Sequence, residues 1–135
     1  MASVVNPIPL KYMDLMQEET KSFLHLATVM ADGTPQVTPV WFDYDGEHVR
    51  INTARGRVKD RNMQKRPHVA GLIVDPANHY RYIQIRGTIV ESTEEGADDH
   101  IRALNFKYHG KREYPIGDQT RVTYVIRIDH VDGHG

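Results

Sequence analysis

Two Asp-Gly pairs divide the first half of the chain into short runs rich in β-branched and apolar residues. Asp32-Gly33 lies between the runs Phe23–Ala31 and Pro35–Tyr44, and Asp45-Gly46 precedes the run His48–Thr53. Asp and Gly both tolerate the positive φ that a tight hairpin turn requires. The pattern therefore predicts three consecutive antiparallel strands, which limits the fold to one built on hairpins.

The rest of the chain alternates further β-prone runs with helical patterns. Strands are expected at Val69–Asp75, Tyr80–Val90 and Val122–Asp129, and helices at Pro9–Glu19, Arg57–Arg66 and Glu94–His109. This order predicts a mainly β fold, a closed or nearly closed antiparallel barrel of six strands with accessory helices.

Local signals refine these predicted elements. Leu10, Met13 and Met16 have the spacing of an apolar helix stripe. Gly87 inside a long strand predicts a bulge or a close approach of another backbone. Ser92-x-x-Glu95 has the spacing of a capping box, and Gly110 stands where the last helix is expected to end.

Composition excludes several classes of protein. The 135 residues fit a single domain over positions 1–135. The chain has no Cys, so it has no disulfide or thiolate metal site, and this fits a cytoplasmic protein. Met1–Pro7 lacks the basic start of a secretory signal, and no apolar run approaches the roughly 20 residues of a membrane span. The eight His residues lack metal-ligand spacing, so we expect no metal site.

Positive charge is concentrated in one short segment. The net charge is only −1, yet six cations fall within twelve residues: Arg55, Arg57, Lys59, Arg61, Lys65 and Arg66. A nearly neutral protein with one compact basic cluster favours a small anionic ligand over nucleic acid. A solvated basic helix face remains the alternative, because charged runs usually face water.

The start of this segment suits an anion. A strand ends at Thr53, a turn containing Gly56 follows, and a helix is expected from Arg57. Free backbone N–H groups at a helix N-terminus attract anions, and Gly allows a ligand close to the backbone. The segment is not a Walker loop, because Gly-x-x-x-x-Gly-Lys is absent.

Three segments taken together resemble one known superfamily: Val37–Phe42, Ile51–Asn62 and Tyr80–Gly87. In order and spacing they are similar to the pyridoxamine-phosphate-oxidase-like split barrels, and more closely to the branch of deazaflavin (coenzyme F-420)-dependent reductases. The resemblance implies a six-stranded antiparallel split β-barrel of the FMN-binding type. It also implies a homodimer with two cofactor sites at the subunit interface.

The resemblance further implies the residues that bind the cofactor. The strand along the ring system corresponds to Thr38, Pro39, Val40 and Trp41. The segment that holds the phosphate and ribityl chain corresponds to Asn52, Thr53, Ala54, Arg55, Gly56, Arg57 and Lys59, with Asn62 close to it. A strand start that lies near the site in the dimer corresponds to Tyr80, Arg81 and Tyr82. Trp41 could also simply fill the barrel, as a lone Trp in a strand often does.

The activity implied is hydride transfer from a reduced deazaflavin to a small organic substrate. Coenzyme F-420 carries a phosphodiester and several carboxylates, so a surplus of cations favours it over the single phosphate of FMN. An FMN-dependent oxidase or reductase on the same fold is one alternative, and a non-enzymatic cofactor carrier is another. A haem role, known in the wider superfamily, would need an axial His that the sequence does not identify. Nor does it single out a catalytic residue among the candidate proton donors Tyr82, Tyr108, His109 and Tyr114.

Overall fold

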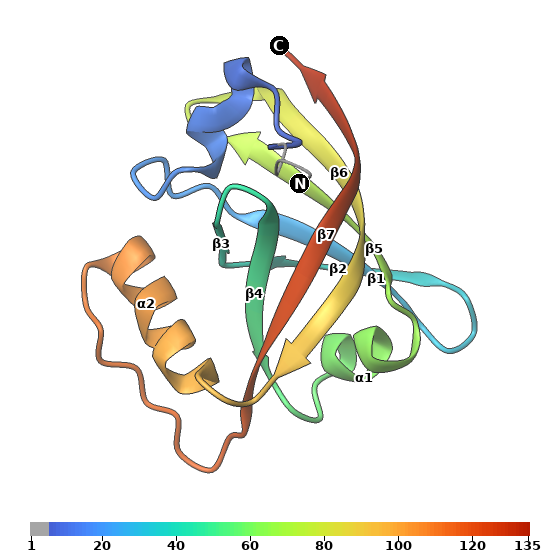
Figure 1. The fold of residues 1–135 in the computed structure, drawn as a ribbon, viewed down its shortest axis with the longest axis vertical. Helices are drawn as coiled ribbons and strands as arrows, with labels where there is room; N and C mark the ends of the chain where they lie inside the picture. The colour runs from blue at the N-terminus through green and yellow to red at the C-terminus, as the bar shows by residue number, and fades with distance from the viewer. Residues whose placement is uncertain (1–5) are drawn as a thin grey trace, which may run out of the picture.

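Seven antiparallel strands form one curled sheet in the computed structural model, which describes residues 6–135 (Figure 1). Met1–Val5, part of the segment in which we expected no secretory signal, lie outside the described residues. The elements in chain order are the 3-10 helix η1 (Leu10–Met16), β1 (Leu24–Val29), β2 (Pro35–Val40), β3 (Phe42–Tyr44), β4 (His48–Ala54), α1 (Val58–Lys65), β5 (His68–Asp75), β6 (Asn78–Thr93), α2 (Ala97–His109) and β7 (Arg121–His134).

The barrel closes at Trp41. The strand order is β2-β1-β5-β6-β7-β4-β3, so β2 and β3 are the two edges of the sheet, and only Trp41 separates them in the chain. The sheet must curl until its edges approach each other, which produces a split barrel. Pro35 and Pro39 lie in β2, where an edge strand tolerates the missing N–H groups.

The prediction of a single strand over Pro35–Tyr44, and hence of six strands and a three-strand meander, was therefore wrong. β2 pairs with β1 and β3 pairs with β4, so this run crosses from one edge to the other. Both predicted hairpins exist, but a local pattern does not show that two adjacent hairpins belong to opposite edges of a sheet.

The core follows the predicted alternation along the strands. Val49, Ile51, Ile83 and Ile126 are fully buried inside the barrel. Gly87 marks a shift in the register between β6 and β7, as predicted. A Cβ at this position would collide with the Arg127 carbonyl, so a close backbone approach requires Gly here.

The three helices of the described residues are each shorter than predicted. The first is a 3-10 helix shorter than Pro9–Glu19, and it buries Tyr12 and Leu15 while leaving Leu10 89% exposed. The Ser92-x-x-Glu95 capping box was wrong, because Ser92 continues β6 and Gly96, in the left-handed region, precedes α2. Gly110 ends α2 with φ 75°, as predicted.

Within residues 6–135, no helix has the length and apolar character to cross a membrane. The same residues contain no group of three or more His, Asp or Glu side chains arranged to hold a metal ion.

Candidate functional site

A cavity of about 390 Å³ opens where the two edges of the sheet meet. Its walls come from β2, the Trp41 junction, β4, both α-helices, the loop after α2 and the start of β7. The lining residues are Phe23, Pro39, Val40, Trp41, Asn52, Arg57, Lys59, Ile101, Tyr114 and Arg121. Six of them are among the residues predicted to bind the cofactor: Pro39, Val40, Trp41, Asn52, Arg57 and Lys59.

A larger groove, of about 520 Å³, lies over β1, β5 and β6. None of the residues predicted to bind the cofactor lines it. The smaller cavity is therefore the better candidate, because it gathers residues from segments far apart in the sequence that were predicted to act together.

Stacked aromatic rings form one wall of this cavity. The rings of Phe23 and Tyr108 are 5.3 Å apart, and those of Tyr108 and Trp41 are also 5.3 Å apart, with interplanar angles of 4° and 13°. Tyr114 meets Trp41 edge-on at 6.3 Å. Trp41 therefore packs within this stack and also lines the cavity. An apolar wall of this kind suits a flat ring system.

Tyr108 itself is a structural residue. Its hydroxyl donates to the carbonyl of Ser22 at 2.5 Å and accepts from the Phe42 N–H at 3.3 Å. Burial raises the pKa of the Tyr108 phenol. Tyr114 is the one candidate proton donor from the sequence that lines the cavity.

Three cations reach the cavity without a carboxylate partner. Arg57, Lys59 and Arg121 form no ion pair with any Asp or Glu in residues 6–135. Burial, together with the charges of Arg57 and Arg121, lowers the pKa of the Lys59 ammonium. Burial also lowers the pKa of Arg121, and the Arg57 charge adds to this, whereas Tyr114 and the Asp98 charge act in the opposite direction. The three positive charges thus repel one another, and an anion between them would relieve that repulsion.

Three of the other four cations of the basic segment are bound within the chain, and the fourth, Lys65, is exposed. Arg55 pairs with Asp60 at 3.0 Å and with Glu94 at 2.9 Å. Arg61 donates to the carbonyl of Gly56 and Arg66 to that of Val29, both at 2.6 Å. Fewer cations are therefore free to bind a ligand at the cavity than the sequence suggested.

Asp60 holds the turn that was predicted to grip a phosphate. Its carboxylate is 1% exposed and accepts from the N–H of Gly56 at 2.9 Å and the hydroxyl of Tyr124 at 2.7 Å. Burial opposes its charge, but hydrogen bonds from Tyr124, Gly56 and Arg55 outweigh burial and lower the pKa of Asp60. The Gly56 N–H, expected to face an anion, thus already has a partner.

Several predicted site residues do not line the cavity. Thr38 and Thr53 have buried hydroxyls with no hydrogen-bond partner among residues 6–135, and Ala54 is buried at the end of β4. Asn62 donates to the hydroxyl of Thr28 at 3.0 Å, beneath α1.

Tyr80, Arg81 and Tyr82 lie at the other end of β6 from the cavity. Tyr82 pairs with His134, at the end of β7, whereas the cavity residue Arg121 begins β7 (Figure 1). Arg81 forms ion pairs with Asp14 and Asp75.

Four lining residues were not among those predicted to bind the cofactor: Phe23, Ile101, Tyr114 and Arg121. Arg121 is the most informative of these, because it is 3% exposed and carries one of the three unpaired charges. An Arg directly before the predicted strand Val122–Asp129 is the only signal that the sequence offered.

Comparisons with known proteins agree with this architecture. The family model for pyridoxamine 5'-phosphate oxidase matches residues 15–135. A solved structure described as an F420 reductase is 36% identical, covers 93% of this chain and 98% of its own, and superposes with a TM-score of 0.84.

More distant structures show the same fold. A conserved hypothetical protein from Mycobacterium tuberculosis is 20% identical, with coverage of 99% of this chain and 89% of its own and a TM-score of 0.73. A putative pyridoxamine 5'-phosphate oxidase from Lactobacillus delbrueckii is 23% identical, with 95% coverage of each chain and a TM-score of 0.66. The family match over residues 15–135, the 36% identity and the split barrel together establish that the chain belongs to the pyridoxamine 5'-phosphate oxidase family.

Proposed function

We propose that this chain, as one split-barrel domain, is an oxidoreductase that binds coenzyme F-420 in the cavity beside Trp41 and reduces a small organic substrate. The observation that carries the proposal is the set of three cations, Arg57, Lys59 and Arg121, that line the cavity and form no ion pair with a carboxylate in the described part of the chain. The resemblance to a structure described as an F420 reductase supports this choice of cofactor.

The residues present fit such a ligand. Charge-assisted hydrogen bonds from the three cations would each contribute roughly 1.5–3 kcal/mol to binding a phosphate or carboxylate. Pro39, Val40 and Trp41 provide an apolar surface along which a ring system can lie. A cavity that is apolar on one side and cationic on the other matches a flat chromophore with an anionic tail.

Bound in this way, the cofactor supplies the hydride. The chain's own residues then have three tasks. The cations would orient the tail, Trp41, backed by Tyr108, would exclude water from one face of the ring system, and the open side of the cavity would admit the substrate.

A titration with two cofactors tests the proposal. Purified protein is titrated with coenzyme F-420 and separately with FMN, and binding is followed by fluorescence. We expect coenzyme F-420 to bind at micromolar concentration or below and more tightly than FMN. Absence of F-420 binding at micromolar concentration would refute the proposal, and tighter binding of FMN would indicate a flavin enzyme. Binding without turnover of any acceptor would indicate a carrier.

Replacing two of the cavity cations tests whether the ligand binds in this cavity. We expect Arg57→Ala/Lys59→Ala to weaken cofactor binding at least tenfold with the fold intact. The matched control, Lys65→Ala/Lys111→Ala, also removes two positive charges, but both side chains are exposed and outside the cavity. Equal affinity in the two double variants would show that Arg57 and Lys59 merely point to solvent.

A further inference from the structure

A chain of buried hydrogen bonds runs behind the wall of the cavity. The Arg121 Nε donates to the Asn52 Oδ1 at 2.9 Å. The Nδ2 of Asn52 donates to the Ala97 carbonyl at 2.8 Å and lies 3.3 Å from the Nδ1 of His100. The His100 Nε2 lies 3.1 Å from the Oδ2 of Asp43. One end of this chain is a cation that lines the cavity, and the other is a carboxylate on a different strand.

The chemistry of its neighbours fixes the orientation of the Asn52 amide. A carbonyl can only accept, so the side of Asn52 that faces Ala97 must be the NH₂ group. A guanidinium can only donate, so the side that faces Arg121 must be the oxygen. The second N–H of the amide is then directed at the Nδ1 of His100, which has to accept it.

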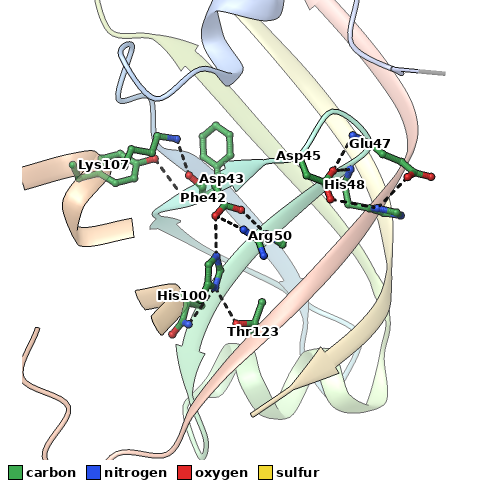
Figure 2. Close-up of polar contacts among 11 residues, drawn as sticks. Phe42, Asp43, Asp45, Glu47, His48, Arg50, His100, Lys107 and Thr123 are labelled. Carbon is green, nitrogen blue, oxygen red and sulfur yellow. Dashed lines mark hydrogen bonds and ion pairs between the residues drawn. The ribbon is translucent and has the colours of Figure 1, made fainter. Parts of the chain in front are cut away.

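The neighbours of His100 fix its tautomer in the same way. The Asp43 carboxylate accepts, so the Nε2 of His100 carries the proton. Nδ1 then has one lone pair, which the Asn52 N–H, with its nitrogen 3.3 Å away, shares with the Thr123 hydroxyl, 2.9 Å away. Figure 2 shows His100 between Asp43 and Thr123, and Arg50 holding Asp43 through bonds of 2.8 and 2.9 Å.

Arg121 depends on this series of hydrogen bonds for its position. Its Nη1 donates to the Oε1 of Gln119, only two residues away, and its guanidinium lies 5.5 Å from the ring centroid of Tyr114. Both partners belong to the segment that leads into β7. The bond to Asn52 is the hydrogen bond that ties the guanidinium to another strand of the barrel.

We propose that His100 is a positioning residue for the ligand's anionic group: its unprotonated Nδ1 holds the Asn52 amide, which in turn directs Arg121 into the cavity. This role rests on the proposed function of the cavity. His100 itself stays behind Asn52 and does not line the cavity. The arrangement assigns a binding role to a histidine that the sequence left without one.

The test replaces His100 in two ways. His100→Phe fills the space but offers no acceptor, whereas the oxygen of Asn in His100→Asn lies at the level of the lost Nδ1. Affinity is measured for coenzyme F-420 and for the same deazaflavin with its ribityl chain but no phosphate. We expect His100→Phe to lose at least tenfold in affinity for coenzyme F-420 and little for the phosphate-free form, and His100→Asn to stay within threefold of wild type.

A merely structural role for His100 gives a different result, because a collapsed cavity would lose affinity for both forms of the chromophore. That outcome, or wild-type affinity in His100→Phe, overturns the positioning role alone. Failure of the wild-type protein to bind coenzyme F-420 refutes the proposed function, and the positioning role falls with it. If His100→Phe does not fold, nitrogen NMR of the wild-type His100 ring decides the matter. We expect a proton on Nε2 and none on Nδ1 at pH 7.5, and the opposite tautomer overturns the inference.

Discussion

Lys107 is a buried cation in a protein whose other lysines mostly face water. It is 5% exposed, its Nζ donates to the Phe42 carbonyl at 2.7 Å, and it lies 4.1 Å from the centroid of the Phe42 ring (Figure 2). Burial lowers its pKa to about 8, although Asp43 and Glu18 favour the charged form. A charged ammonium at this position therefore costs stability at neutral pH.

This cost should depend on pH in a defined direction. The unfolded chain holds the Lys107 proton up to about pH 10.4, whereas the folded protein releases it near pH 8. The cost is present in full below pH 8 and is relieved as the pH rises toward 10. We expect the free energy of unfolding of wild type, relative to Lys107→Met, to rise by about 1–2 kcal/mol between pH 7 and pH 9.5. Urea unfolding of both proteins at both pH values measures it. An unchanged difference would contradict the shift.

Asp60 is the residue on which the geometry of the turn before α1 depends. Its carboxylate accepts from Gly56, Tyr124, Arg55 and Gln64. Asp60→Asn would place an amide N–H opposite groups that themselves donate hydrogen bonds. We therefore expect this substitution to destabilise the fold by roughly 2–4 kcal/mol. Asp99→Asn, with an exposed side chain on α2, is the matched control and should change stability by less than about 0.5 kcal/mol. Similar melting temperatures for the two variants would contradict this role.

Among the elements, two glycines contribute to the fold for different reasons. A Cβ at Gly87 would collide with the Arg127 carbonyl and lie 2.7 Å from the Ile126 Cγ2, in the middle of the β6–β7 ladder. A Cβ at Gly110 would meet nothing, but its φ of 75° is unfavourable for other residues. We expect Gly87→Ala to cost roughly 2–4 kcal/mol and Gly110→Ala roughly 1–2 kcal/mol. Thermal unfolding of both variants measures the difference, and the reverse order would show that the ladder relaxes around Gly87.

The elements themselves could largely be predicted from the sequence, because their signals are local. Asp32-Gly33 and Asp45-Gly46 predicted hairpins, and alternation along His48–Thr53 predicted that Val49 and Ile51 are buried. Asn52, on the other face of the strand, is buried as well, which alternation did not predict. The break at Trp41 could not be predicted, because it depends on which strands lie at the edges of the finished sheet. Ser92 has the spacing of a helix cap but continues β6, since pairing with Tyr124 extends that strand.

At the scale of the whole molecule, long-range partners bind some cations of the basic segment and leave others free. Arg55 is neutralised in part by Glu94, which is 39 residues away, and Arg66 is bound to the Val29 carbonyl, 37 residues away. Arg57 and Lys59 find no such partner in residues 6–135 and reach the cavity, where Arg121 joins them. The sequence showed that positive charge gathers here, but only the folded barrel decides which charges are left for a ligand.

The position of Tyr80 leads to a prediction about assembly. Its side chain is 82% exposed, at the opposite end of β6 from the cavity of the same chain. The family resemblance implies that this strand start lies near the cofactor site. If it does, Tyr80 must approach the cavity of a second copy of the chain. We therefore expect a homodimer, with a mass by light scattering about twice that of the 15.5 kDa chain.

Dimerisation and cofactor binding should then be linked. Tyr80→Ala removes an exposed side chain, so we expect little change in the melting temperature but at least a fivefold weaker affinity for coenzyme F-420, the loss expected when one interfacial contact of about 1 kcal/mol is removed. Phe106→Ala is the control, because it also truncates an exposed aromatic ring, but on α2. This variant should bind the cofactor as wild type does. A monomeric wild-type protein with full affinity would place the whole site within one chain, and Tyr80 would then have no part in it.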